Sequence, residues 1–407
     1  MNRIRQLTTL GQSVWLDFTQ RSFVASGELR RLIEQCGVSG VTSNPAIFDQ
    51  AITETSDYTQ AIEQAARRGY LSRDTYEQII VQDIKAVADE LLGVFGHKNR
   101  HDGFVSLEVA PHFARDTNKT MVQAHDFWHR VGRPNLMIKV PGTMEGLASI
   151  RQLIADGINV NITLLFGLKR YAAVAEAYMS GLEDRLARNQ PIEHIFSVAS
   201  FFISRIDLHV DPLLTEPALQ ARHPANILAL KGQAGIAYAR KAFEQYTRLF
   251  QSERFKRLRA QGAKPQHLLW ASTGTKNPNE RDVRYVEALV GPETITTLSR
   301  PTLEAFIHHG EASVQLPGNL GEADAVVRCL GDVGIDLEAV AAQLEEEGIQ
   351  KFTRSFDHLM SELERKLAAA RKSIGKSPQP NPSPATTSQA LSSPAGEANM
   401  RIDNPHP

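Results

Sequence analysis

The chain has 407 residues, of which 42% are hydrophobic and 22% are charged, and its formal net charge at pH 7 is −1. This is the composition of a globular protein long enough for one large α/β barrel with additions or for two domains. A net charge near zero gives no general attraction for nucleic acid or a membrane surface, so neither partner is expected. No run of 18 apolar residues and no hydrophobic signal core occur. Cys36 and Cys329 lie outside any C-x-x-C pattern, which predicts neither a disulfide framework nor a zinc site and fits a reducing cytoplasm.

Eight short apolar segments are predicted to be strands, and helical patterns separate them. The predicted strands are Val14–Phe18, Gly40–Asn44, Phe104–Ala110, Leu136–Val140, Asn159–Phe166, His194–Phe202, His267–Thr273 and Thr294–Leu298. The predicted helices are Ser26–Ile33, Asp116–Val131, Met144–Ala155, Tyr171–Ala187 and Ala225–Arg259. This alternation indicates parallel βαβ units, and eight is the number of strands that closes a barrel. An open doubly wound sheet alternates in the same way but usually has a Gly-rich turn after its first strand, and none is present here. We therefore predict an α/β protein with a (β/α)8 barrel of the TIM type.

The C-terminal part of the chain divides into two regions. The pattern of apolar residues in 321–374 predicts additional helices. The apolar positions are Leu337, Val340, Leu344, Phe352, Phe356, Leu359, Met360 and Leu363. After Gly375 the chain is dominated by Pro, Ser, Thr, Ala and Asn, and the apolar periodicity is lost. Such a segment cannot bury enough surface to offset the entropy lost on ordering. We expect residues 1–374 to form a barrel with a C-terminal helical extension and 375–407 to form a disordered tail.

One predicted buried strand contains a lysine. Lys139 lies between Ile138 and Val140, and Pro141 and Gly142 form the loop that ends the strand. Desolvating an ammonium group is costly, so burial favours a neutral amine, which attacks carbonyls to form a Schiff base. The alternative is an ordinary lysine that buries its stem and extends its charge to water. This segment alone favours the alternative, whereas the other strands favour the catalytic interpretation.

Polar side chains lie near one end of each of the first seven predicted strands. They include Asp17, Asn44, Glu108, Lys139, Asn161, Thr163, Ser200, Arg205, Ser272 and Lys276. In a (β/α)8 barrel the carboxyl ends of the strands line the active site. Taken singly, Asp17 could be a loop cap at a strand end, and Asn44 before Pro45 could simply start a turn. A purely structural parallel strand needs none of these groups, so together they predict a catalytic centre.

The chain resembles the transaldolase family, in particular its longer bacterial form with extra helices. The segments that carry the resemblance are Trp15–Asp17, Gly40–Phe48, Ser106–Val109, Met137–Pro141, Gly157–Phe166, Ser197–Arg205 and Trp270–Pro278, in family order within residues 14–306. The resemblance implies a (β/α)8 barrel and Schiff-base aldol chemistry with no cofactor and no metal. It also implies sugar phosphate substrates: a dihydroxyacetone unit is transferred from sedoheptulose 7-phosphate to glyceraldehyde 3-phosphate, giving erythrose 4-phosphate and fructose 6-phosphate, in the pentose phosphate pathway.

The resemblance and the chemistry together assign the catalytic roles. Lys139 attacks the ketose carbonyl, and the iminium that forms serves as the electron sink for cleavage of the C3–C4 bond. Asp17 is the base for the C4 hydroxyl. Glu108 moves protons during dehydration of the carbinolamine, through a water held with Thr163. Because the intermediate is covalent, ping-pong kinetics are expected.

Binding roles follow from the same resemblance. Asn44 and Asn161 are expected to hold the substrate hydroxyls and the enamine, and Ser200 to contact the same fragment. Donor and acceptor both carry phosphate, so a cationic anchor is required. Arg205 matches the arginine of the family's sixth strand and can grip phosphate with its guanidinium fork. Ser272 matches the serine of the seventh strand.

The sequence departs from the shorter transaldolases just after this serine. Those proteins have an arginine two residues further on, whereas this chain has Gly274, with Lys276 two residues beyond it. A lysine binds phosphate as a point charge, so we assign the role to Lys276. The alternative is a solvent-exposed loop lysine. Lys231, in the long helical insertion, is a weaker candidate.

Two rival classes of function remain. A single-substrate aldolase of the same superfamily, of the fructose 6-phosphate type, would use the same lysine; the length of the chain argues weakly against it. A non-catalytic barrel would be expected to have lost the catalytic residues, and they are intact here. The sequence leaves the oligomeric state open between monomer and homodimer, and it does not show whether residues 321–374 complete the site.

Overall fold

The computed structural model describes residues 2–98 and 100–376. Eight parallel strands close a barrel in chain order, with β8 paired to β1. The strands are β1 (Gln12–Asp17), β2 (Gly40–Thr42), β3 (Val105–Glu108), β4 (Leu136–Pro141), β5 (Val160–Leu165), β6 (Ser197–Phe202), β7 (His267–Ala271) and β8 (Thr294–Leu298). All eight predicted strands are present, with bounds that differ by a few residues. The predicted (β/α)8 barrel is therefore confirmed.

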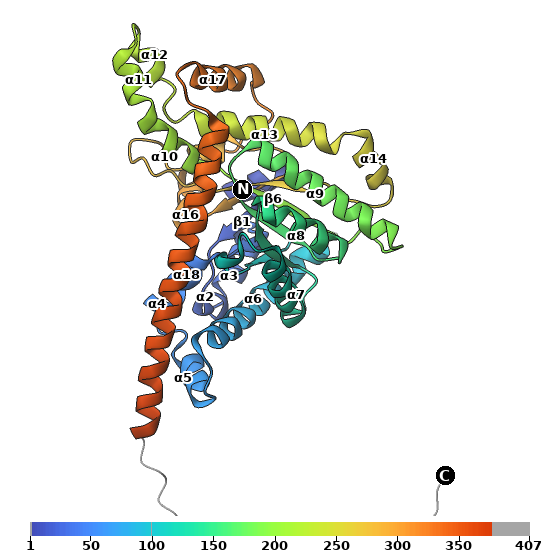
Figure 1. Cartoon of the computed structure of the whole chain (residues 1–407), viewed down its shortest axis with the longest axis vertical. Helices are drawn as coiled ribbons and strands as arrows, with labels where there is room; N and C mark the ends of the chain where they lie inside the picture. The colour runs from blue at the N-terminus through green and yellow to red at the C-terminus, as the bar shows by residue number, and fades with distance from the viewer. Residues whose placement is uncertain (1, 99, 377–407) are drawn as a thin grey trace, which may run out of the picture.

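Helices surround the barrel, as Figure 1 shows. They are α1 (Arg3–Thr9), α2 (Arg21–Ala25), α3 (Glu28–Arg31), the π-helix η1 (Leu32–Cys36), α4 (Pro45–Glu54), α5 (Thr59–Arg67), α6 (Ser72–His97), the 3-10 helix η2 (Pro111–Phe113), α7 (Thr117–Val131), α8 (Met144–Ala155), α9 (Leu168–Ala187), α10 (Ser204–Leu213), α11 (Thr215–Gln220), α12 (Pro224–Leu228), α13 (Ala234–Phe250), α14 (Glu253–Ala260), α15 (Arg284–Ala288), α16 (Arg300–His309), α17 (Leu320–Asp332) and α18 (Leu337–Lys376). In the described part of the chain, no helix has both the length and the apolar character needed to span a membrane.

Aromatic side chains fill the end of the barrel where the strands begin. Residues two apart on a strand share a face, so Trp15 points to the same side of β1 as Asp17. The Trp15 indole donates a hydrogen bond to Asp102 at 2.9 Å, and the rings of Phe104 and Phe196 stack at 4.6 Å. These buried rings pack this end of the barrel, whereas the pocket lies at the carboxyl ends of the strands.

One segment predicted to be a single continuous helix is divided into three helices. The segment predicted as a single helix, Ala225–Arg259, is divided among α12, α13 and α14. Gly232, between α12 and α13, has a φ of 70°, a left-handed conformation that interrupts the helical path and favours glycine. Ser252 begins α14 by accepting a hydrogen bond from the Phe255 amide at 3.3 Å.

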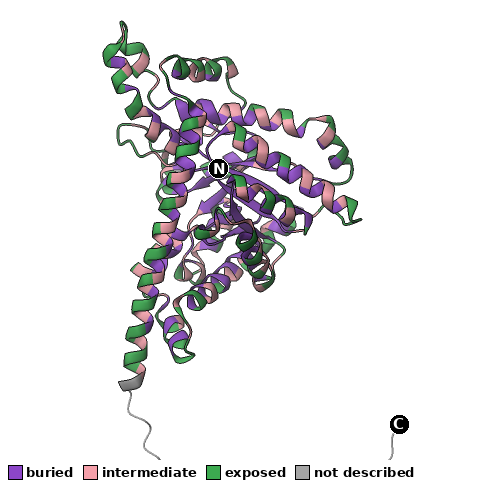
Figure 2. Ribbon diagram, viewed as in Figure 1, coloured by how far each residue is buried: buried purple, intermediate pink, exposed green. Residues whose placement is uncertain are grey.

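The predicted C-terminal helices are confirmed as α17 and α18. Figure 1 shows α18 running along one side of the molecule from near α17 to beyond α5. Its apolar stripe packs on α4, α5 and α6. Figure 2 shows buried and exposed positions alternating along α18, whereas the strands of the barrel are buried almost throughout. The Lys366 ammonium donates to the carbonyls of Ile52 at 2.6 Å and Thr53 at 3.1 Å, at the negative end of α4.

The first half of α18 lies beside the carboxyl end of β5. Gly348 permits this approach, because a Cβ atom placed there would be 2.8 Å from the Leu164 side chain. Lys376 ends α18, and the rest of the predicted tail 375–407 lies outside the described residues. The predicted division into domain and tail therefore stays a prediction.

Candidate active site

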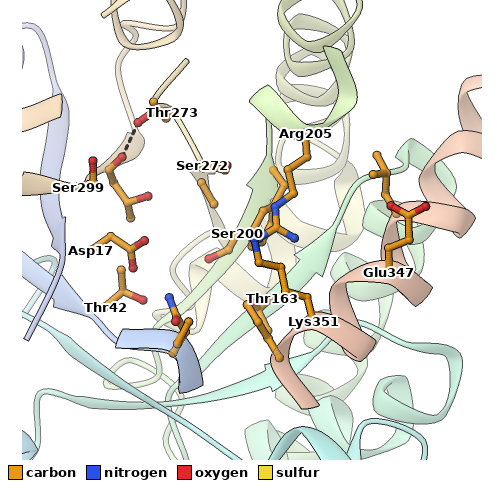
Figure 3. A pocket seen from close by; sticks show the side chains of 18 of the residues that line it. Asp17, Thr42, Thr163, Ser200, Arg205, Ser272, Thr273, Ser299, Glu347 and Lys351 are labelled. Atoms are coloured by element: carbon orange, nitrogen blue, oxygen red, sulfur yellow. Dashed lines mark hydrogen bonds between the residues drawn. The ribbon is translucent and has the colours of Figure 1, made fainter. Parts of the chain in front are cut away.

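A pocket of about 790 Å³ opens at the carboxyl ends of the strands. Strand ends, α10 and α18 contribute its walls, and Figure 3 shows their side chains converging on it. Most of the predicted site residues line this one pocket: Asp17, Asn44, Lys139, Thr163, Ser200, Arg205, Ser272 and Lys276. Its size is in the usual range for small-molecule sites.

Lys139 is held at the base of the pocket by the register of three strands. Glu108 on β3 and Asn161 on β5 are its direct neighbours across the sheet. Its Nζ atom lies 3.1 Å from Glu108 Oε2 and donates a hydrogen bond to the Ser43 carbonyl at 3.1 Å. Lys139 is only 4% exposed, so its charge does not extend to bulk water. The alternative interpretation of an ordinary strand-end lysine is therefore wrong.

Two carboxyl groups flank this ammonium. Burial raises the pKa of Asp17, and the charges of Lys139 and Arg205 oppose that rise. Burial likewise raises the pKa of Glu108, which Lys139 opposes and the neighbouring Asp17 reinforces. Both acids thus interact with the Lys139 cation, Asp17 also with Arg205, and both hold their protons more tightly than in water. Raised carboxyl pKa values suit proton transfer near neutral pH.

Amide and hydroxyl groups form the next part of the site. Asn161 is fully buried and is not among the residues that line the pocket. It donates to Ser106 Oγ at 2.9 Å and accepts from Ser200 Oγ at 2.7 Å. The structure therefore places Ser200, rather than Asn161, at the pocket surface. Thr163 Oγ1 is buried and has no hydrogen-bond partner in the described chain, which leaves it available to a water or a substrate group.

Two further predicted residues have structural as well as pocket-lining positions. Asn44 Oδ1 accepts from the Ile47 amide at 3.1 Å and caps α4, so Asn44 has the local structural role given by the alternative interpretation, and its contact with substrate stays a prediction. Ser272 has a φ of 56°, and its hydroxyl lies 3.0 Å from Ser204 Oγ. Such strained backbone conformations in residues other than glycine concentrate at functional sites.

Comparison with known proteins gives the family. The sequence model described as Transaldolase/Fructose-6-phosphate aldolase matches residues 14–363. The chain belongs to this family. It is 41% identical over 373 residues to Transaldolase 2 of a Nostoc species, covering 90% of this chain and 98% of that relative. It is also 41% identical over 371 residues to Transaldolase of Saccharopolyspora erythraea, covering 91% and 99%. Transaldolase of Thiobacillus denitrificans is 41% identical over 363 residues, covering 89% and 100%. The predicted membership of the transaldolase family is confirmed.

The structure adds residues that the sequence analysis missed in this transaldolase-family site. Leu344, Glu347, Lys351 and Arg354 of α18 line the pocket, whereas the weaker candidate Lys231 does not. Their spacing of three and four residues is the available signal, because it places a polar stripe on one face of a helix. That signal does not say what the stripe faces. Among the described residues, no group of three His, Cys, Asp or Glu side chains could hold a metal ion.

Proposed function

We propose that this protein is a transaldolase that moves a dihydroxyacetone unit from sedoheptulose 7-phosphate to glyceraldehyde 3-phosphate through a Schiff base on Lys139. The observation that carries the proposal is the buried Lys139 ammonium, 3.1 Å from Glu108 and in the same pocket as Asp17. The relatives named transaldolase, each aligned over about nine-tenths of this chain, support the same activity.

The first half of the reaction cleaves the donor. The Lys139 amine adds to the C2 carbonyl, and the carbinolamine loses water to give an iminium. Glu108 donates and accepts the protons of this step, and the Thr163 hydroxyl holds a bridging water; its lack of a hydrogen-bond partner among the described residues supports this role. Asp17 then takes the C4 hydroxyl proton, the C3–C4 bond breaks, and its electrons pass to the iminium. Erythrose 4-phosphate leaves, and the three-carbon enamine stays on the lysine.

The second half reverses these steps with a new aldehyde. The enamine attacks the aldehyde carbon of glyceraldehyde 3-phosphate, and Asp17 returns its proton to the new hydroxyl. Water then releases fructose 6-phosphate and restores the amine of Lys139. Ser200, hydrogen-bonded to the buried Asn161, is positioned to orient the fragment between the two halves. Arg205, Ser272 and Lys276 are the proposed phosphate contacts.

A single-substrate aldolase of the fructose 6-phosphate type remains the second candidate, because the family description includes that activity. The two activities differ in what releases the enamine. A transaldolase needs an acceptor aldehyde, whereas an aldolase protonates the enamine and frees dihydroxyacetone. Product analysis with and without erythrose 4-phosphate, starting from fructose 6-phosphate, separates them.

Borohydride reduction in the presence of fructose 6-phosphate tests the covalent step. We expect a reduced adduct on Lys139, located by peptide mapping, and no adduct in Lys139→Arg, which keeps the charge but cannot form the Schiff base. Lys372→Met is the matched control, since Lys372 is exposed on α18. An adduct on another residue, or none in the unaltered protein, would rule out the proposed mechanism.

A further inference from the structure

The outer part of the pocket carries more positive charge than the proposed chemistry uses. Four cationic side chains line it: Arg205 from α10, Lys276 from the loop after β7, and Lys351 and Arg354 from α18. Only one carboxylate outside the Lys139 centre, that of Glu347, lines the same pocket. Such an excess of one charge in a concave site favours a ligand of the opposite charge.

In the part of the chain that the structure describes, these four cations lack direct partners, although Asp17 and Glu347 interact with Arg205 electrostatically. Among the described residues, none of them forms a hydrogen bond or an ion pair, and Arg205 only lies over the Phe202 ring at 5.4 Å. Lys351 in particular is not paired with Glu347, although four residues on one helix is the spacing at which such pairs form. The charge of Arg205, followed by partial burial and the charges of Lys276 and Arg354, lowers the pKa of Lys351. An anion among these groups would relieve their mutual repulsion.

The geometry of α18 directs Lys351 into the site. Leu344, Glu347, Lys351 and Arg354 follow one another at intervals of three, four and three residues, so they form one stripe facing the pocket. Figure 3 shows Lys351 from α18 and Arg205 from α10 extending towards the same region. Gly348 lets the helix lie close enough to β5 for this, as its contact with Leu164 shows.

The loop after β7 contributes one charged residue to the pocket lining, Lys276, beside the uncharged Ser272, Thr273 and Gly274. Gly274 lines the pocket but has no side chain, and a Cβ atom added there would lie 3.0 Å from Thr302 Oγ1. Substitution with a longer cationic residue would require this neighbour to move. The side of the pocket next to Arg205 is instead occupied by α18.

We propose that Lys351 is a phosphate-binding residue that, with Arg205, selects phosphorylated sugars in this pocket. The inference rests on the proposed function and adds to it a specificity-determining residue from outside the barrel. A phosphate carries up to two negative charges, and two cations from different elements can contact different oxygens. The helix that contains Lys351 is then part of the substrate site and not only a brace for the barrel.

The test uses the full-length protein and Lys351→Met, which keeps most of the side-chain volume and removes the charge. Lys351→Arg preserves the charge, and Lys372→Met makes the same change at an exposed position of the same helix. Inorganic phosphate is titrated into each protein by calorimetry. In parallel, kcat and KM are measured for fructose 6-phosphate and for fructose.

We expect Lys351→Met to weaken phosphate binding and to raise KM for fructose 6-phosphate roughly 10- to 100-fold, the usual effect of losing one charged hydrogen bond. kcat and the kinetics with fructose should stay within about twofold, because Lys139 is untouched. Lys351→Arg and Lys372→Met should resemble the unaltered protein.

Two results would overturn the inference: phosphate binding in Lys351→Met equal to that of the unaltered protein, or equal losses on fructose and fructose 6-phosphate, which would make Lys351 structural. Failure of the unaltered protein to bind phosphate would also overturn it. Failure of the unaltered protein to form any borohydride adduct would instead remove the proposed function, and the phosphate titration would still decide the role of Lys351.

Discussion

Replacing Lys139 with methionine should change stability as well as activity. In the native protein the Lys139 ammonium opposes the burial that raises the pKa values of Asp17 and Glu108. Methionine keeps the bulk of the side chain but removes the cation beside Glu108 and one of the two cations that act on Asp17, leaving Asp17 with Arg205 alone. The pKa values of both acids should rise further in the folded variant, whereas in the unfolded chain they stay near about 4. The folded variant therefore binds protons that its unfolded chain has released.

The sign and size of the effect follow from this difference. Where the folded state binds more protons than the unfolded state, stability falls as pH rises. Removing one partner of a buried ion pair costs about 3–5 kcal/mol while the other stays charged. The 3.1 Å contact of Lys139 with Glu108, which is 7% exposed, places this pair in that class. We expect a loss of this order at pH 8. This loss of stability should become smaller towards pH 5. The change is up to about 1.4 kcal/mol per pH unit for each carboxyl group that is protonated in the folded variant and ionised in the unfolded chain.

Urea unfolding of the native protein, Lys139→Met and Lys139→Met/Glu108→Gln at several pH values between 5 and 8 tests this. The double variant removes one of the two acids that have lost the Lys139 charge, so at pH 8 it should be more stable than Lys139→Met. Lys139→Met should also give no borohydride adduct. If the stability of Lys139→Met varied with pH in the same way as that of the native protein, the Lys139 ammonium would not be lowering the pKa values of Asp17 and Glu108, and the reasoning would be refuted.

Four further predictions concern single substitutions. Asp17→Asn should still trap substrate on the lysine but release erythrose 4-phosphate from sedoheptulose 7-phosphate roughly 10²- to 10⁴-fold more slowly, and normal release would contradict its role as the base. Arg205→Ala should lower kcat/KM for fructose 6-phosphate roughly 10- to 100-fold and spare fructose, whereas equal losses would withdraw the phosphate role. Gly40→Ala should cost about 1–3 kcal/mol in urea unfolding, because its Cβ would lie 2.5 Å from the Trp15 ring. Gly93→Ala, on the exposed face of α6 with open space around it, should stabilise by about 0.5–1 kcal/mol, and a loss there would contradict the packing argument.

The strands and the grouping of polar residues in the candidate site were predictable because their signals are local. A buried parallel strand is a nearly continuous apolar run, so polar residues such as Glu108 and Lys139 stand out in it. The order of the strands then brings these exceptions to one end of the barrel. The continuous helix expected over Ala225–Arg259 was wrong because apolar periodicity continues through Gly232 and Ser252, where backbone conformation and capping decide the boundaries.

The contribution of α18 was not predictable in the same way. Its apolar periodicity identifies which face is buried but not which elements cover it. The position of Lys351 in the pocket depends on contacts of α18 with β5 and α10, which are distant in sequence. Asn161 shows the converse limit: its polarity marked it as a binding residue, whereas its amide is already engaged by Ser106 and Ser200. Its predicted contact with substrate remains a prediction.

The location of α18 after the eighth strand has a consequence for how the protein is made. A nascent chain that has reached Leu298 contains all eight strands together with Lys139, Glu108 and Asp17. The stripe that ends at Arg354 is still to be synthesised at that stage, so the mouth of the barrel has one wall missing. During translation, the residues of the proposed catalytic centre are therefore synthesised before the α18 residues that line the same pocket. In engineering, the two parts can be varied separately: a library confined to positions 344, 347, 351 and 354 changes the pocket lining contributed by α18 and leaves the proposed catalytic residues Lys139, Glu108 and Asp17 unaltered.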